Sequence, residues 1–206
     1  MPLPRTEIIV FDGFDDLDAV GPLEVLDAAG FPVTVVLAAR GGHSRTGRVR
    51  SAHGLELTVT ASLSDAPELV IVPGGGWRDG APTGVRAECS GELPARLAEL
   101  HDSGTVLASV CTGAMLLSAA GVLRGRPAVT NHIAHADLVA AGAELHAEAR
   151  VVDDGSVVTC GAPAAGLDLA VHLVGRYGGD ELARVVAEGF EHAPVGPVLV
   201  SAATRR

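Results

Sequence analysis

The sequence has little cysteine and few basic side chains, and each shortage excludes a class of protein. Its three cysteines are an odd number and lack the spacing of a disulfide framework. The amino terminus has no basic segment followed by an apolar one, so we expect a reducing, cytoplasmic location. Lys and Arg number 15 against 25 Asp and Glu, and the formal net charge of −10 disfavours nucleic acid and anionic membranes as partners. A small-molecule or protein partner is therefore expected.

One uncharged stretch resembles a membrane span. Residues 103–123 carry no charged side chain, and their number would suffice to cross a bilayer. Gly104, Gly113 and Gly121 divide the stretch, and serine and threonine residues interrupt it. We therefore interpret it as a buried strand followed by a buried helix, at the centre of the fold.

Composition and patterning indicate a single α/β domain. The 206 residues are 48% hydrophobic without a break in composition, so one domain is expected over residues 1–206. Its core would span about 7–194, and 195–206 would form a partly ordered carboxyl-terminal tail. Apolar strands alternate with helices, which predicts a three-layer sandwich with a mostly parallel, flavodoxin-like sheet flanked by helices.

The expected elements follow from apolar periodicity and from the positions of glycine and proline. Strands are expected at residues 7–11, 31–38, 69–72, 105–110 and 127–130, with hairpins over 48–60 and 150–159. Helices are expected at residues 18–28, 92–100, 114–120, 133–141, 163–176 and 180–188. Such sheets bind ligands beyond the carboxyl ends of their parallel strands, so the loops after these strands are expected to form the site.

The most informative segment is 109–113, where an apolar strand ends in Cys111 and a helix of small residues begins at once. At such a turn, the free backbone N–H groups of the helix point back at the side chain. They would stabilise a thiolate and lower the thiol pKa. Cys111 is therefore the candidate nucleophile of a strand-to-helix elbow, and the alternative is a small buried hydrophobic residue.

An acidic loop follows the first strand, and Asp18 opens the expected helix after it. Its carboxylate could simply cap free N–H groups of that helix. If the loop lies beside Cys111, a thiolate would instead raise the carboxyl pKa and make Asp18 a proton donor near neutral pH. Asp15 and Asp16 compete with Asp18 for this role.

The glycine-rich turn at residues 73–76 follows a buried strand. It has neither the lysine nor the following capped helix of a phosphate loop, so nucleotide binding is not expected. A glycine at this place leaves a bare N–H free to approach a substrate. The N–H groups of Gly75 and Thr112 could together hold developing negative charge, as an oxyanion hole does.

Another candidate segment, Asn131 and His132, follows the strand at 127–130. Because the end of that strand should face the site, His132 is a candidate substrate contact. His135 could share a face with it, but no Cys, Asp or Glu completes a metal set, so no metal is expected. Trp77, the sole tryptophan, could line a pocket or cover the glycine turn.

Several motifs together carry a resemblance to a known family. They are Leu17-Asp18 with Gly21-Pro22, Ile71-Val72-Pro73-Gly74-Gly75, Ser109-Val110-Cys111-Thr112-Gly113, Ala119-Ala120-Gly121-Val122-Leu123-Arg124-Gly125 and Ala165-Gly166-Leu167-Asp168. With them, roughly residues 7–194 resemble the ThiJ/PfpI superfamily, whose fold is similar to that of class I glutamine amidotransferases. Within this superfamily, the chain is most similar to the isocyanide hydratase group.

The resemblance implies a homodimer in which Cys111 is the nucleophile and Asp18 is the acid or base beside it. It also implies that Gly75 and Thr112 line the anion pocket. In the implied reaction, Cys111 attacks the terminal carbon of an isocyanide, Asp18 delivers a proton, and water releases an N-substituted formamide. No metal or organic cofactor is implied. Asn131-His132-Ile133 stands where the hydratases tend to have Thr-His-Trp, which removes an aromatic wall and adds an amide.

Three other functions stay open at this point. A cysteine amidase or peptidase of the same fold usually has histidine directly after the nucleophile, where this chain has Thr112. A glyoxalase or deglycase usually has glutamate where Asp18 stands. A redox or ligand sensor without catalysis is the third, since an exposed thiol of low pKa oxidises readily.

Overall fold

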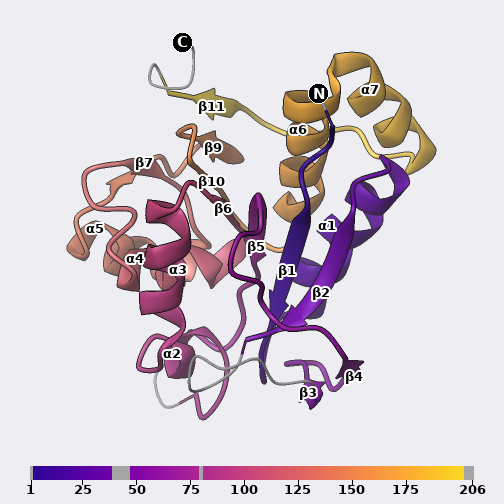
Figure 1. Ribbon diagram of the computed structural model, residues 1–206. Helices are drawn as coiled ribbons and strands as arrows, with labels where there is room; N and C mark the ends of the chain where they lie inside the picture. The colour runs from indigo at the N-terminus through magenta and orange to yellow at the C-terminus, as the bar shows by residue number, and fades with distance from the viewer. Residues whose placement is uncertain (1, 39–46, 79–80, 202–206) are drawn as a thin grey trace.

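The computed structural model describes residues 2–38, 47–78 and 81–201, and a seven-stranded sheet runs through its centre (Figure 1). The strands are β1 (Thr6–Val10), β2 (Val33–Leu37), β5 (Leu69–Val72), β6 (Val106–Ser109), β9 (Val151–Asp153), β10 (Val157–Cys160) and β11 (Val198–Val200). Their order is β11-β9-β10-β6-β5-β1-β2, and every neighbouring pair is parallel except β9 with β10. The prediction of a mostly parallel α/β sheet is confirmed.

Helices cover both faces of the sheet, which gives three layers (Figure 1). One face carries α1 (Asp16–Ala28), α6 (Ala165–Gly178) and α7 (Asp180–Gly189). The other carries α2 (Val85–Glu88), α3 (Leu93–Asp102), α4 (Ala114–Ala119) and α5 (His135–Ala140), with the short 3-10 helices η1 (Cys111–Gly113) and η2 (His132–Ala134). Two small sheets pair β3 (Gly47–Arg50) with β4 (Glu56–Val59) and β7 (Pro127–Ala128) with β8 (Glu144–Leu145).

The central strands are mostly apolar because helices cover them on both sides. All residues of β5 and of β10 are buried. Ile8, Ile9 and Val10 of β1 are likewise inaccessible to solvent. Such fully buried strands are typical of parallel sheets. Because β1, β5 and β6 are neighbouring parallel strands, the loops after their carboxyl ends meet at one edge of the sheet.

The first helix begins earlier than the sequence pattern predicts. It starts at Asp16 rather than Asp18, because the Asp15 side chain caps it by accepting a hydrogen bond from Leu17 N–H at 3.2 Å. Asp18 therefore lies in the first turn of α1 and not at its cap. The capping role that could have explained Asp18 belongs to Asp15.

Two other elements differ from expectation because their partners are distant in sequence. The expected strand at 127–130 is shortened to β7, which pairs with β8 outside the main sheet. In the expected tail, residues 198–200 form β11 and pair with β9 at the sheet edge, so this part of the tail is ordered. Residues 202–206 of that tail lie outside the described part of the chain.

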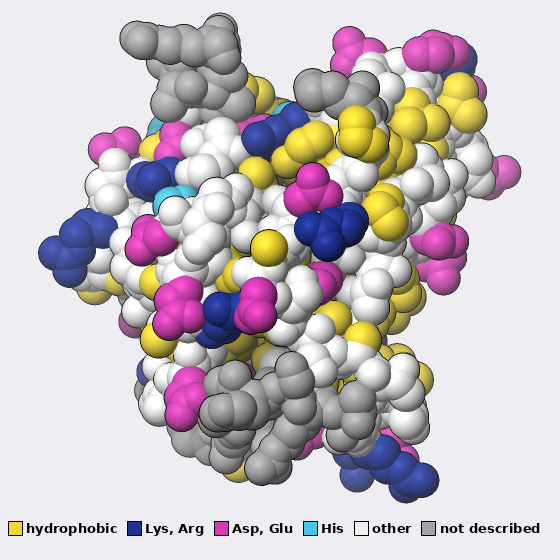
Figure 2. All heavy atoms as spheres, viewed as in Figure 1, with side chains coloured by type: hydrophobic (Ala, Val, Ile, Leu, Met, Phe, Trp, Pro, Cys, Tyr) yellow, Lys and Arg dark blue, Asp and Glu magenta, His cyan; other side chains and the backbone are white. Residues whose placement is uncertain are grey.

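The uncharged stretch 103–123 lies inside the fold, while charged side chains lie on the surface. On the face shown in Figure 2, acidic and basic side chains are intermingled. In the described part of the chain, no helix is both long and apolar enough to cross a bilayer. The uncharged stretch 103–123 instead contains β6, η1 and α4 at the centre of the fold, as its glycines indicate.

Candidate active site

The structure places Cys111 at a tight turn between β6 and α4. Its φ angle is +56°, in the left-handed region that residues other than glycine rarely adopt. The Thr130 hydroxyl donates a hydrogen bond to the Cys111 carbonyl at 2.8 Å, and Val110 N–H donates to the Val72 carbonyl at 3.0 Å. At Gly113, an added Cβ would collide with that same carbonyl. The turn is therefore fixed against the end of β5, and its strain is local to the candidate nucleophile.

The Cys111 side chain lies at the floor of a pocket of about 380 Å³ and is 6% exposed. The Asn131 side-chain amide donates a hydrogen bond to Sγ at 3.3 Å. The Thr112 backbone N–H also points to the sulfur. The pocket is lined by Asp15, Gly75, Gly76, Trp77, Arg78, Ala81, Cys111, Thr112, Asn131, Ile133 and Pro163.

Asp18 lies beside Cys111 and is fully buried. Its Oδ2 accepts a hydrogen bond from Gly74 N–H at 2.9 Å, while Oδ1 has no hydrogen-bond partner among the described residues. Burial, and then the negative charge of Asp15, raise the pKa of Asp18 to about 7. The sequence predicted a raised pKa, but attributed it to a thiolate rather than to burial. Asp18 can therefore gain or lose a proton near neutral pH.

The prediction of a lowered thiol pKa at Cys111 is wrong. Burial, followed by the negative charge of Asp18, raises the pKa of Cys111 to about 12. The Asn131 amide and the Thr112 N–H oppose this rise, but they are outweighed. Burial and the neighbouring carboxyl group therefore outweigh the backbone N–H that was expected to stabilise a thiolate. With a pKa of about 12, Cys111 is a thiol at neutral pH.

The N–H groups of Gly75 and Thr112, which were expected to be free to bind an anion, both have partners in the structure. Gly75 N–H donates to the Thr112 hydroxyl at 3.0 Å, and the Thr112 N–H points to the sulfur. The cause is the close approach of the glycine turn to the elbow. A Cβ on Gly74 would lie 2.7 Å from Thr112 N and 2.8 Å from the nearer oxygen of Asp18. Gly75 and Thr112 line the pocket, but their N–H groups already have partners.

Asn131 reaches the site, whereas His132 does not. The Asn131 Oδ1 accepts a hydrogen bond from Ile133 N–H at 3.1 Å, which starts the 3-10 turn η2. This turn leaves His132 exposed and outside the pocket lining, so its expected substrate contact is not found. Ile133 lines the pocket instead. His135 hydrogen-bonds to the Thr130 carbonyl at 3.1 Å, and no set of three metal-binding side chains occurs among the described residues.

Two pocket residues were left undecided by the sequence. Asp15 was one of three competing acids; it caps α1, lines the pocket, and its charge raises the pKa of both Asp18 and Cys111. Trp77 lines the pocket from the loop after β5. Aspartate in the position before a helix is a capping signal, so Asp15 could have been separated from Asp18 by a better helix boundary. No local signal distinguishes the two roles of Trp77.

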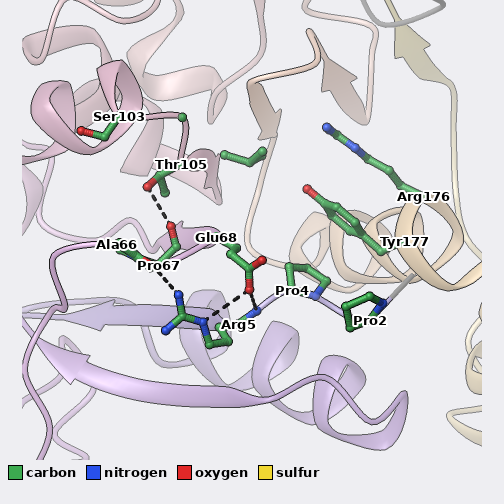
Figure 3. A pocket seen from close by; sticks show the side chains of 12 residues that line it. Pro2, Pro4, Arg5, Ala66, Pro67, Glu68, Ser103, Thr105, Arg176 and Tyr177 are labelled. Atoms are coloured by element: carbon green, nitrogen blue, oxygen red, sulfur yellow. Dashed lines mark hydrogen bonds and ion pairs between the residues drawn. The ribbon is translucent and has the colours of Figure 1, made fainter.

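A larger cavity, of about 560 Å³, lies at the opposite ends of the strands (Figure 3). Its charged side chains are paired. The Arg5 Nε lies 3.5 Å from the Glu68 Oε2, and the Arg176 Nη1 lies 3.1 Å from the Asp153 Oδ1. The Thr105 hydroxyl in its wall donates to the Pro67 carbonyl. This cavity contains none of the candidate residues, so the candidate site is the smaller pocket around Cys111.

Comparison with known proteins finds one matching family and several similar proteins. Residues 5–176 match the DJ-1/PfpI family. Isonitrile hydratase of Pseudomonas putida is 34% identical over 92% of this chain and 78% of its own length. A deglycase of Thermococcus kodakarensis is 30% identical over 74% of this chain and 86% of its own.

Solved structures show the same fold. A ThiJ/PfpI family protein of Pseudomonas syringae superposes with a TM-score of 0.81 and 26% identity, over 96% of this chain and 78% of that one. DJ-1β of Drosophila melanogaster superposes with a TM-score of 0.78 at 23% identity, over 94% and 100% of the two chains. By its matched residues, its relatives and its fold, the chain belongs to the DJ-1/PfpI family.

Proposed function

We propose that this protein hydrates isocyanides to N-substituted formamides, with Cys111 as nucleophile and Asp18 as the proton carrier. The observation that supports it most directly is the juxtaposition of a buried carboxyl group of pKa about 7 with a thiol of pKa about 12. Near neutral pH the thiol therefore keeps its proton, and the carboxyl group can accept or release one. Addition of water to an isocyanide needs a nucleophile and a proton delivered to the same carbon.

The first step follows from the protonation states. Above pH 7, Asp18 is mostly a carboxylate and Cys111 a thiol. As the sulfur attacks the terminal carbon of the isocyanide, the S–H bond breaks and its proton passes to Asp18. Asp18 then gives this proton to the carbon that the attack has made basic. One C–S bond and one C–H bond have formed, and the product is a thioimidate on Cys111.

The second step consumes water. A water molecule adds to the thioimidate carbon, a proton reaches the substrate nitrogen, and the C–S bond breaks. The sulfur recovers a proton, and an N-substituted formamide leaves. The Asn131 amide, at 3.3 Å from Sγ, stabilises negative charge on the sulfur as it arrives and departs. No group outside this chain and water is needed to balance the reaction.

The raised thiol pKa speaks against a redox sensor. Oxidation requires a thiolate that is open to solvent, and Cys111 is buried and protonated. The deglycase relative keeps dicarbonyl chemistry as the alternative enzymatic activity. The sulfur of Cys111 could also add to a carbonyl carbon, with the Asp18 carboxyl group carrying the proton. Substrate tests must therefore include both classes.

The deciding experiment is product analysis by chromatography. The purified protein is incubated with several alkyl and aryl isocyanides and, separately, with methylglyoxal. We expect formamide from the wild type and none from Cys111→Ala, whereas Cys89→Ala, at a half-buried thiol outside the pocket, retains activity. Absence of formamide from every isocyanide would refute the proposal.

A further inference from the structure

We infer that Trp77 is the specificity-determining wall of the pocket, against which the flat, apolar group of a substrate packs. The identity of that substrate as an aryl isocyanide depends on the proposed function. The contacts that hold Trp77 in place take no part in the proposed reaction. The chain has a single tryptophan, and it lines the pocket that holds Cys111.

The Trp77 indole is fixed from two helices. Its Nε1–H donates a hydrogen bond to Asp137 of α5 at 2.8 Å. The guanidinium of Arg86 on α2 lies 4.2 Å from the ring centroid, and its Nε donates to the Trp77 carbonyl at 2.8 Å. Arg86 and Asp137 are themselves 3.8 Å apart. Ring and backbone are therefore both restrained before any ligand enters, so binding against the ring costs little additional side-chain entropy.

The pocket is lined by polar and charged side chains, among them Asp15 and Arg78, as well as by apolar ones. The polar groups surround Cys111, where Asn131 and Thr112 donate to the sulfur. The apolar side chains of the lining are those of Trp77, Ala81, Ile133 and Pro163. Ile133 is 48% exposed, although it is a large aliphatic side chain beside the pocket. A substrate with a small reactive head and a flat apolar body fits this division, because the body then covers surface that is otherwise left in water.

An aromatic wall should favour aryl over small alkyl groups. Aromatic rings pack against an indole with large buried area and favourable edge or stacked geometry, which a methyl group cannot match. We expect aryl ligands to bind at least about tenfold more tightly than methyl ligands. A tryptophan that only linked α2 to α5 would stabilise the fold without making aryl ligands bind more tightly than methyl ligands.

Binding is measured without turnover, in the Cys111→Ala variant. The probes are N-phenylformamide and N-methylformamide, the products of an aryl and of a methyl isocyanide. Because Trp77 is the sole tryptophan, its fluorescence reports directly on a ligand at the wall. We expect N-phenylformamide to shift or quench this emission at concentrations about tenfold lower than N-methylformamide. Calorimetry of the same variant gives the two dissociation constants independently.

Substitutions then separate a wall from a mere link between α2 and α5. In the Cys111→Ala background, Trp77→Phe should keep most of the aryl preference, and Trp77→Leu should lose it although the side chain remains apolar. Trp77→Ala should lose it too, and circular dichroism checks that each variant is folded. Val139→Ala is the control, because Val139 is exposed on α5 and lies outside the pocket lining. It should leave the ratio of the two constants unchanged.

The inference and the proposed function fail in different ways. Equal affinity for both formamides, or an aryl preference retained in Trp77→Leu, would overturn the wall even if isocyanides are hydrated. Preferential binding of the aryl probe that depends on Trp77, without formamide production by the wild type, would support the wall and refute the hydratase.

Discussion

Asp18 lies buried beside Cys111, which lines the pocket, and both groups have raised pKa values for the same first reason, burial. The negative charge of Asp18 also disfavours a thiolate at Cys111, whereas a hydrogen bond with Cys111 acts to lower the pKa of Asp18. At neutral pH the pair holds between one and two protons. In the proposed reaction, the carboxylate therefore acts as a base toward the thiol, rather than as a partner of a preformed thiolate.

Activity should therefore rise with pH through about 7. The form that can take the thiol proton is the Asp18 carboxylate, which predominates only above its pKa of about 7. We expect kcat/KM for an isocyanide to increase across this range and then to level off. Asp18→Asn removes the base and should lower the rate at least about hundredfold. A profile that is flat between pH 6 and 8 in the wild type would contradict this role.

The stability of the protein should fall as pH rises from about 4 to about 7. The unfolded Asp18 carboxyl group has an ordinary pKa near 3.8, whereas the folded one has a pKa of about 7. The folded state therefore binds this proton more tightly, and its advantage is lost as the folded group ionises. Asn mimics the protonated acid, so Asp18→Asn should be more stable than wild type at pH 8, by up to about 4 kcal/mol. Urea unfolding at pH 5 and pH 8 measures this, and a greater gain at pH 5 than at pH 8 would contradict it.

The Asn131 amide should matter through its contact with sulfur. Asn131→Asp keeps the oxygen that accepts from Ile133 N–H, but it removes the donor to Sγ and adds negative charge there. We expect kcat to fall about hundredfold, whereas the neutral Asn131→Leu should cost about tenfold. Steady-state kinetics with one isocyanide gives both values. His132→Ala is the matched control, since the neighbouring side chain is exposed, and a comparable loss in that variant would point to the turn rather than to the amide.

The elbow should not tolerate a side chain at Gly113. An added Cβ would collide with the Val72 carbonyl, so Gly113→Ala must push η1 away from β5. We expect a loss of about 2–4 kcal/mol in the free energy of unfolding, together with loss of activity. Gly189→Ala on α7 is the control, because nothing lies within 4 Å of its added Cβ. Thermal unfolding of both variants tests this, and equal stability of the two would show that the turn is not tightly packed.

Local sequence patterns predicted the parallel sheet and the elbow because both depend on short segments. The apolar strands before Gly74 and Cys111 are largely buried, and a glycine, Gly74 or Gly113, lies within four residues of each strand end. Parallel pairing then brings those ends together whatever the details of the intervening loops. The same patterns misplaced the start of α1 by two residues, because Asp15 and Asp18 are both acceptable caps in sequence.

The amino-acid sequence by itself determined the alternation of strands and helices, the position of Cys111 at a turn, and the presence of acids in and just after the loop that follows β1. Only the tertiary structure decided the charge on that cysteine. Burial and the nearby Asp18 outweigh the N–H groups that favour a thiolate, and burial is a property of the packed chain. It also decided that His132 faces solvent and that Trp77 is clamped at the pocket by Arg86 and Asp137. Those contacts join segments whose proximity no local pattern encodes.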